Sequence, residues 1–320
     1  MYKLTGVVLT SALVMAGCGS GGGGSSSSTA AALPTTTSLS GTAAKGMIKQ
    51  ARVLACRIAD GAPEPDASCA SGTTGNDGSF KVTFSDGYTG PTMVKVMASA
   101  ASTMMDETTG NDIPYNMTMR AVVPSISGTT TVYVTPFSEM AASAVSTTMI
   151  DATKIHQSIS TVESLMSSMG INLSVMPMVN LKDNGTNSNM LAMQSNMVKQ
   201  LARVALAAKN SNMLMDANGV PCNAVGTTPS QQIACTVEAM ASVMTSYGSY
   251  DMTKAATMMT ALNGQNVTNI TMPVITAEGT ISSQVVDMTS SASMQTAMLN
   301  AGMSVNNAAY TVNVIMGGMH

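Results

Sequence analysis

The sequence has little of what enzymes and nucleic-acid-binding proteins usually depend on. Of its 320 residues, only 10% are charged and 3% aromatic, there is no tryptophan, and two are histidines. The formal net charge of −3 at pH 7 argues against a nucleic acid partner, because such a partner demands a basic surface. Past residue 17, no stretch is apolar and uncharged for long enough to span a bilayer.

Neither histidine stands in a catalytic or metal-binding motif. His156 lies within a predicted helix, where we expect it at the surface, and His320 is the last residue of the chain. No nucleophile–base set, metal-protease motif or phosphate-binding loop can be assembled. We therefore expect a non-enzymatic protein without a cofactor. An enzyme built from Asp, Glu, Ser and Thr is the third-ranked hypothesis, which sequence alone does not test.

Residues 1–17 have the organisation of an export signal: Lys3, then an apolar run too short to span a bilayer, then small residues. The run ends in Ala16-Gly17-Cys18, which resembles the lipobox of bacterial lipoproteins. The resemblance implies cleavage before Cys18, two fatty acyl chains such as palmitate on its thiol, and a third on the new amine. Gly19, where Asp would imply inner-membrane retention, favours the outer membrane. The alternative is a secreted protein with a chance cysteine.

Residues 18–40 are rich in Gly, Ser and Thr and read as a flexible tether. A coil of this length has a root-mean-square reach of roughly 25 Å. This predicted tether supports the lipoprotein interpretation, because a lipid-anchored domain needs a spacer between the membrane and the fold. The membrane is then the first expected partner, through Cys18.

Four cysteines remain after Cys18: Cys56, Cys69, Cys222 and Cys235. They allow three connectivities, of which the two equally spaced local pairs, Cys56–Cys69 and Cys222–Cys235, are the simplest. A loop of about 15 residues gives a disulfide worth roughly 3 kcal/mol in the chain-entropy model. The alternative, four buried free thiols, fits an exported protein less well.

Residues 41–134 alternate short β-branched runs with turn residues, which predicts strands. The candidate strands are Ala51–Ile58, Ser79–Phe84, Thr92–Ala98, Tyr115–Val122 and Thr130–Val134, with Asn76-Asp77-Gly78 as a turn. The segments Gly41-Thr42-Ala43-Ala44-Lys45-Gly46, Ala51-Arg52-Val53 and Asn76-Asp77-Gly78-Ser79-Phe80 resemble the prealbumin-like, or carboxypeptidase-regulatory-like, module of bacterial surface lipoproteins. That resemblance implies an antiparallel β-sandwich that serves as a binding or spacer unit rather than as an enzyme.

Residues 135–320 predict a mainly α-helical domain. Thr135 is suited to cap a helix that begins at Pro136, and Thr228 with Gln231 forms a second capping pattern. Apolar residues at helical spacing predict helices around 137–149, 155–169, 190–208, 233–244, 258–262 and 281–298. Tyr310–Val314 alternates and predicts a strand, which would pair with Ile270–Ile275 in a C-terminal β-ribbon.

An acidic loop at Asp106-Glu107 and Asn111-Asp112 has ligands suited to Ca²⁺, but its spacing matches no calcium-loop template. We expect a solvated acidic loop instead. Asp183–Asn187 also fails the EF-hand spacing and reads as a turn.

Methionine is the compositional outlier, with 32 residues. Thioethers bind Cu(I), and they also scavenge oxidants. The third interpretation is that Met replaces Leu in the core, where flexible thioethers fill gaps. We favour core filling, because most Met fall on apolar helical stripes. We therefore expect no metal site and no tight copper binding. The best exception is the group Met316, Met319 and His320, which lie close together in sequence.

The sequence therefore predicts an α+β protein, with an N-terminal antiparallel β-sandwich followed by a helical domain. The predicted function is that of an outer-membrane lipoprotein acting as a non-enzymatic binding or structural module for a protein or glycan partner. The alternative is a Met-rich lipoprotein that scavenges oxidants or handles copper.

Overall fold

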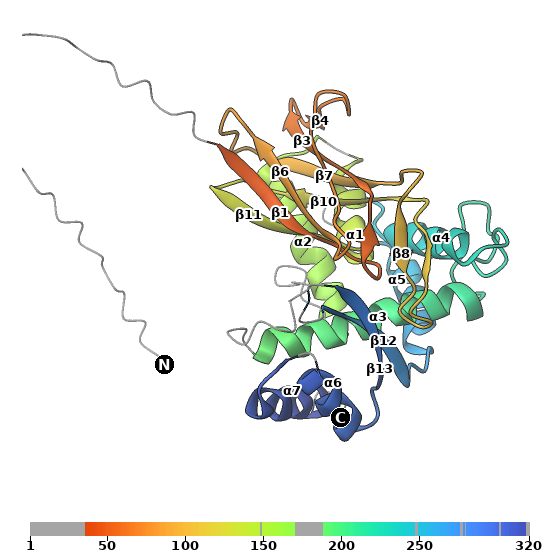
Figure 1. Cartoon of the computed structure of the whole chain (residues 1–320). Helices are drawn as coiled ribbons and strands as arrows, with labels where there is room; N and C mark the ends of the chain where they lie inside the picture. Colours follow the sequence, from red (N-terminus) through yellow and green to blue (C-terminus); the bar gives the residue numbers. More distant parts are fainter. Residues whose placement is uncertain are drawn as a thin grey trace, which may run out of the picture. The chain divides into compact units, whose positions relative to one another are not determined.

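The computed structural model describes residues 36–147, 149–169, 188–246, 249–275, 278, 280–300 and 302–317. It is an α+β structure in which the strand-rich part comes first in the chain (Figure 1). The predicted signal peptide, Cys18, Asp183–Asn187, Met319 and His320 lie outside the described residues. The described helices include none long and apolar enough to cross a membrane.

The strand-rich part contains two larger sheets. Its strands are β1 (Thr37–Ala43), β2 (Ile48–Lys49), β3 (Arg52–Ala59), β4 (Ala62–Pro63), β5 (Ala70–Thr73), β6 (Ser79–Phe84), β7 (Thr92–Met97), β8 (Thr103–Met105), β9 (Asp112–Pro114), β10 (Thr118–Val123) and β11 (Thr129–Val134). One sheet has the order β11-β1-β6 and the other β10-β7-β3-β4, with β5 also on β3, while β2-β8-β9 form a small third sheet. All five predicted strands are present, with ends shifted by a few residues at most.

Residues from both larger sheets bury their side chains in one hydrophobic cluster. Leu39 of β1, Phe80 of β6 and Val94 of β7 belong to it, as do Ala205 and Ile233 from the helical part. Strand β1 begins at Thr37, inside the range predicted as tether, because Leu39 is fully buried between its two neighbouring strands. β1 pairs parallel to β11 and antiparallel to β6, so this sheet is mixed rather than purely antiparallel.

The predicted turn at Asn76-Asp77-Gly78 is confirmed. It joins β5 to β6, and Gly78 has a φ of 74°, which favours glycine. The Asp77 Oδ1 atom accepts a hydrogen bond from the Ser79 N–H at 3.0 Å. The turn therefore contains the Asp and the Gly that the sequence pattern predicts for it.

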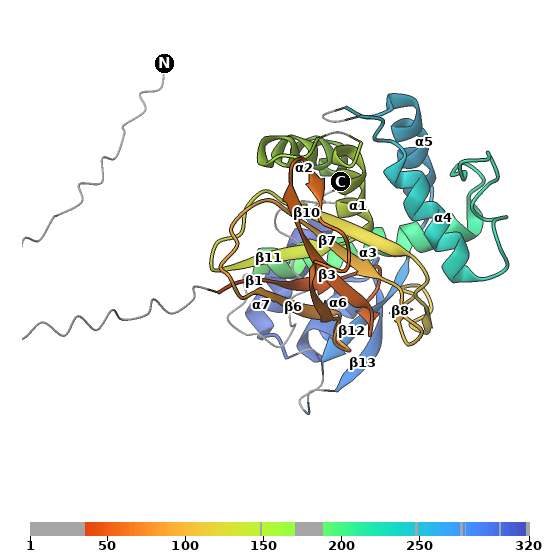
Figure 2. The same ribbon diagram turned by 90° about the horizontal axis from the view of Figure 1, so that it is seen from above.

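The rest of the chain contains α1 (Pro136–Val145), α2 (Ala152–Ser167), α3 (Ser188–Asn210), α4 (Pro229–Ala241), α5 (Met252–Asn263), β12 (Asn269–Ile275), β13 (Ile281–Asp287), α6 (Ser291–Asn300) and α7 (Val305–Gly317). The predicted caps are confirmed: Thr135 and Thr228 each cap a helix whose first residue is proline. Helix α1 packs on strand β10, and the two lie side by side in both views (Figures 1 and 2).

The second part is not mainly helical as predicted, because it also contains the β12–β13 hairpin. Residues 281–287, predicted to begin a helix, form β13, which pairs antiparallel with β12 from Asn269↔Asp287 to Ile275↔Ile281. Ile281 and Val285 fit helical spacing, but β-branched residues also suit a strand, and pairing with a neighbouring strand decides the outcome.

The predicted strand at Tyr310–Val314 is also wrong. These residues lie in α7, where Ala308 and Val312 are buried one helical turn apart against a shared cluster. The predicted ribbon partner, Ile270–Ile275, is a strand, but it pairs with β13 instead.

Candidate binding cleft

A cleft of about 950 Å³ lies along the sheet β10-β7-β3-β4. A smaller hollow of about 220 Å³ continues it between β10, α1 and α4. The two share Met117, Thr118, Arg120, Glu139 and Glu238, so we treat them as one site and call it the binding cleft.

The period-two geometry of the strands explains which side chains reach the cleft. Lys95 of β7 is the register partner of Arg120 on β10 and of Leu54 on β3, so these three side chains share one face of the sheet. Their sequence neighbours Val96 and Met119 point to the opposite face and are buried in the core between the sheets. One strand alternation thus supplies both a core face and a charged cleft face.

Arg120 and Glu139 form the most elaborate contact in the cleft. The Glu139 carboxylate, from the first turn of α1, accepts from the Arg120 guanidinium at 3.0 Å and from the Arg120 backbone N–H at 2.6 Å. Ser138 Oγ donates to the Arg120 carbonyl at 2.9 Å. Helix α1 therefore satisfies the backbone of β10 at its free edge, which fixes one wall of the cleft.

The environment of Glu139 perturbs its ionisation. Burial raises the pKa of the Glu139 carboxyl above its ordinary value, while the hydrogen bonds and charge of Arg120 act in the opposite direction. Glu139 is only 9% exposed as a side chain. An acidic residue in the first turn of a helix is favourable on its own, so the local sequence does not indicate the long-range contact of Glu139 with β10.

The opposite wall is fixed by an ion pair and a disulfide. Lys95 Nζ donates to Asp66 at 2.6 Å. Asp66 lies in the loop closed by the Cys56–Cys69 disulfide, which confirms the predicted local pairing. The two sulfur atoms and an Asp66 oxygen lie within 4.8 Å of one another, but sulfurs bonded to each other cannot serve as thiolate metal ligands.

The cleft therefore presents fixed, mutually compensated charges. Lys95 and Arg120 are like charges directly opposite each other, an arrangement that is unfavourable alone and that Asp66 and Glu139 offset. Glu238 on α4 adds an exposed carboxylate, and the partly exposed Met97 adds apolar surface. Such a surface suits a partner with both polar and apolar groups.

The prediction of a solvated acidic loop after β8 is wrong for Asp106 and Glu107, whereas Asn111 and Asp112 are exposed as expected. Asp106 is 2% and Glu107 1% exposed. Glu107 accepts hydrogen bonds from Lys45 Nζ and from the Gly46 N–H, and Asp106 accepts from Lys209 of α3 at 2.9 Å. The prediction is wrong because both cationic partners lie far away in sequence.

The described part of the chain also locates the other predicted residues. The Cys222–Cys235 disulfide is present as predicted and joins α4 to the loop that precedes it. His156 is exposed on α2, as expected. Met316 lies in α7, but its two companions at the candidate metal site, Met319 and His320, lie outside the described residues.

More than half of the 32 methionines are buried. One cluster with Phe137 and Leu201 contains five methionines of the predicted helical stripes: Met166, Met169, Met197, Met240 and Met244. This confirms packing in the core for those five, and the side chain of Met193 lies outside the described set. Met149 and Met252, by contrast, are 69% and 67% exposed.

The sequence missed Lys95 and Arg120 as cleft residues. The available signal was a charged residue in the middle of an apolar strand, such as Arg120 between Met119 and Ala121. A strand pattern shows that such a side chain leaves the core face, but not which element covers it.

Comparison with known proteins gives no further guidance for these residues. No family model, no curated protein and no solved structure matches this chain. Function has to be argued from the geometry of the sites themselves.

Proposed function

We propose that this protein is a membrane-anchored, non-enzymatic lipoprotein that binds a protein or glycan partner in the binding cleft. The observation that carries the proposal is the cleft itself, a hollow of about 950 Å³ whose walls are fixed by paired side chains. Pre-organised polar groups bind with less loss of conformational entropy than mobile ones, which favours recognition.

The chemistry of the cleft favours binding over catalysis. The Glu139 carboxylate is occupied by the guanidinium and backbone N–H of Arg120, and the Lys95 ammonium by Asp66. Groups held in this way are positioned as hydrogen-bonding and electrostatic contacts. A general base instead needs a lone pair within reach of a substrate proton.

The location rests on the N-terminal pattern. The lipobox-like Ala16-Gly17-Cys18 and the following Gly/Ser-rich stretch support an acyl anchor on Cys18 and a spacer before β1. Gly19 favours the outer membrane, with the cleft on its periplasmic or external side. Two sheets sharing one core, followed by Thr135-Pro136 and a helix, support the prealbumin-like interpretation of the β part.

Site-specific photo-crosslinking tests the binding proposal. A photoreactive residue at Thr118, which is exposed in the cleft, is expected to give a discrete adduct in intact cells. The same residue at Lys81, exposed on β6 of the other sheet, is the matched control and is expected not to give that adduct.

A charge reversal sharpens the test. Glu238→Lys changes an exposed group of the cleft lining and is expected to weaken the Thr118 adduct without altering the fold. Equal adducts from Thr118 and Lys81, or an adduct unaffected by Glu238→Lys, would contradict recognition through the cleft.

The alternative of a Met-rich, oxidant-scavenging or copper-handling protein is favoured by a different observation. Four buried methionines line one small cavity under the β12–β13 hairpin.

A further inference from the structure

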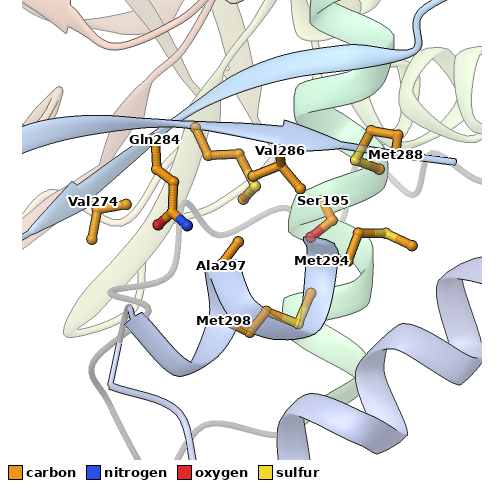
Figure 3. A pocket seen from close by; sticks show the side chains of 9 residues that line it. Ser195, Val274, Gln284, Val286, Met288, Met294, Ala297 and Met298 are labelled. Carbon is orange, nitrogen blue, oxygen red and sulfur yellow. The ribbon is translucent and has the colours of Figure 1, made fainter. Parts of the chain in front are cut away.

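Four of the nine residues that line the cavity under the β12–β13 hairpin are methionines. Met272 comes from β12, Met288 follows β13, and Met294 and Met298 lie one turn apart on α6. All four are at most 5% exposed. Figure 3 shows Met288, Met294 and Met298 around the cavity, with Ser195 from α3. Its volume is about 10 Å³, close to the least that admits one water molecule or one bare ion.

Ser195 gives the cavity an unusual polar feature. Its Oγ atom is buried and has no hydrogen-bond partner among the described residues, and the side chain is 2% exposed. Figure 3 shows this oxygen directed into the space between Met294 and Met298. A buried hydroxyl without a partner disfavours the folded state, so a bound species that faces its lone pairs recovers part of that loss.

The donor set selects the chemical class of the species. Thioethers are soft ligands that suit Cu(I) and not Mg²⁺ or Ca²⁺, which require oxygen ligands and retain water. The four methionines come from the middle of β12, from the residue after β13 and from α6, and they line one cavity.

We propose that this cavity binds one soft monovalent cation, Cu(I), through the thioethers of Met272, Met288, Met294 and Met298, with the Ser195 oxygen facing the ion. Ag(I) binds in the same way and is a redox-inert probe. Binding is a simple association in which no electron is transferred, and the Cu(I) arrives already reduced. None of the residues that line this cavity lines the binding cleft.

The first experiment is an Ag(I) titration of the full mature protein labelled with ¹³C in the methionine methyl groups. One equivalent of Ag(I) is expected to shift four methyl signals, assigned to the lining by single Met→Leu variants. A competition titration with a Cu(I) chelator under anaerobic conditions then gives the affinity. Shifts confined to exposed methionines such as Met149 and Met252 would overturn the proposal.

Variants provide the second arm. Met294→Leu and Met298→Leu keep the volume nearly constant and are each expected to weaken Ag(I) and Cu(I) binding at least tenfold. Met303→Leu is the matched control, because Met303 belongs to the same hydrophobic cluster but does not line the cavity. Ser195→Ala is expected to weaken binding by a smaller factor.

Unchanged affinity in both Met294→Leu and Met298→Leu, or an equal loss in Met303→Leu, would refute the site. The methyl shifts of the wild-type protein do not depend on the variants folding, so they test the proposal even if one variant is unstable.

Discussion

Replacing Lys45 with methionine tests the buried ion pair that joins the β part to the acidic loop. Lys45 is 0% and Glu107 1% exposed, and Glu107 also accepts from the Gly46 N–H. The Glu107 carbonyl accepts from the Thr271 N–H at 2.8 Å, so the loop also holds β12. Lys45→Met leaves a buried carboxylate without its cation.

The magnitude follows from the fate of that carboxylate. Removing one partner of a buried pair costs about 3–5 kcal/mol. Glu107 escapes the full penalty by taking up a proton. Protonating it at pH 7, from an ordinary pKa of 4.5, costs about 3.4 kcal/mol at 1.36 kcal/mol per unit. We therefore expect a loss of about 3–4 kcal/mol, a large share of the 5–15 kcal/mol typical of a folded domain.

The pH dependence has a definite sign. Burial raises the pKa of the Glu107 carboxyl, and Lys45 opposes this, so the variant raises that pKa further. When the folded-state pKa of an acid lies above the unfolded one, the folded state binds more protons and stability falls as pH rises between the two values. The loss caused by Lys45→Met is therefore expected to be smaller at pH 5 than at pH 7.

Urea unfolding measures these differences, with the free energy of unfolding extrapolated to water. Lys49→Met is the matched control, because it removes the Lys49–Asp112 pair, whose side chains are 19% and 43% exposed. That pair is expected to contribute at most about 1 kcal/mol. If Lys45→Met destabilises no more than Lys49→Met, or loses the same amount at both pH values, the reasoning about the buried pair is wrong.

Three further predictions concern the anchor, the second disulfide and the methionines. Cys18→Ser is expected to move the protein from the membrane pellet to the soluble fraction, and persistence in a salt-washed pellet would place the anchor elsewhere. The double variant Cys222→Ser, Cys235→Ser is expected to lose about 3 kcal/mol of unfolding free energy in urea, and an unchanged midpoint would contradict this. Mild hypochlorite is expected to oxidise the exposed Met149 and Met252 first, as read by mass spectrometry; equal rates at buried Met166 would refute core packing as protection.

Local chemistry made much of the fold predictable. The Asn76-Asp77-Gly78 turn, the Thr135-Pro136 helix start and the Cys56–Cys69 pair each depend on residues close in sequence, and each is present. Strand alternation likewise identified β6 with both of its ends correct. Such features need no knowledge of the rest of the chain.

The errors fall where distant segments decide the outcome. Residues 281–287 fit a helix by spacing, yet pair with β12. Glu107 looks solvated until Lys45, 62 positions away, is folded against it. Arg120 could be assigned to the outer face of its strand, but the helix residue Glu139 that binds it could not. A single sequence records which faces are apolar, not which surfaces meet.

Helix α3 contributes to the thioether cavity and packs against α4, which lines the binding cleft. Ser195 near its first turns faces the thioether cavity, and Lys209 in its last turn binds Asp106 of the buried loop. Between them, Ala205 and Ala208 share the β core with Val237 of α4, the helix that carries Glu238 into the cleft. A shared element is not by itself a coupling, because coupling requires two arrangements that both sites bias. Ion binding should therefore raise the thermal stability of the hairpin and α6, and it should change partner affinity at the cleft only if α3 has a second position.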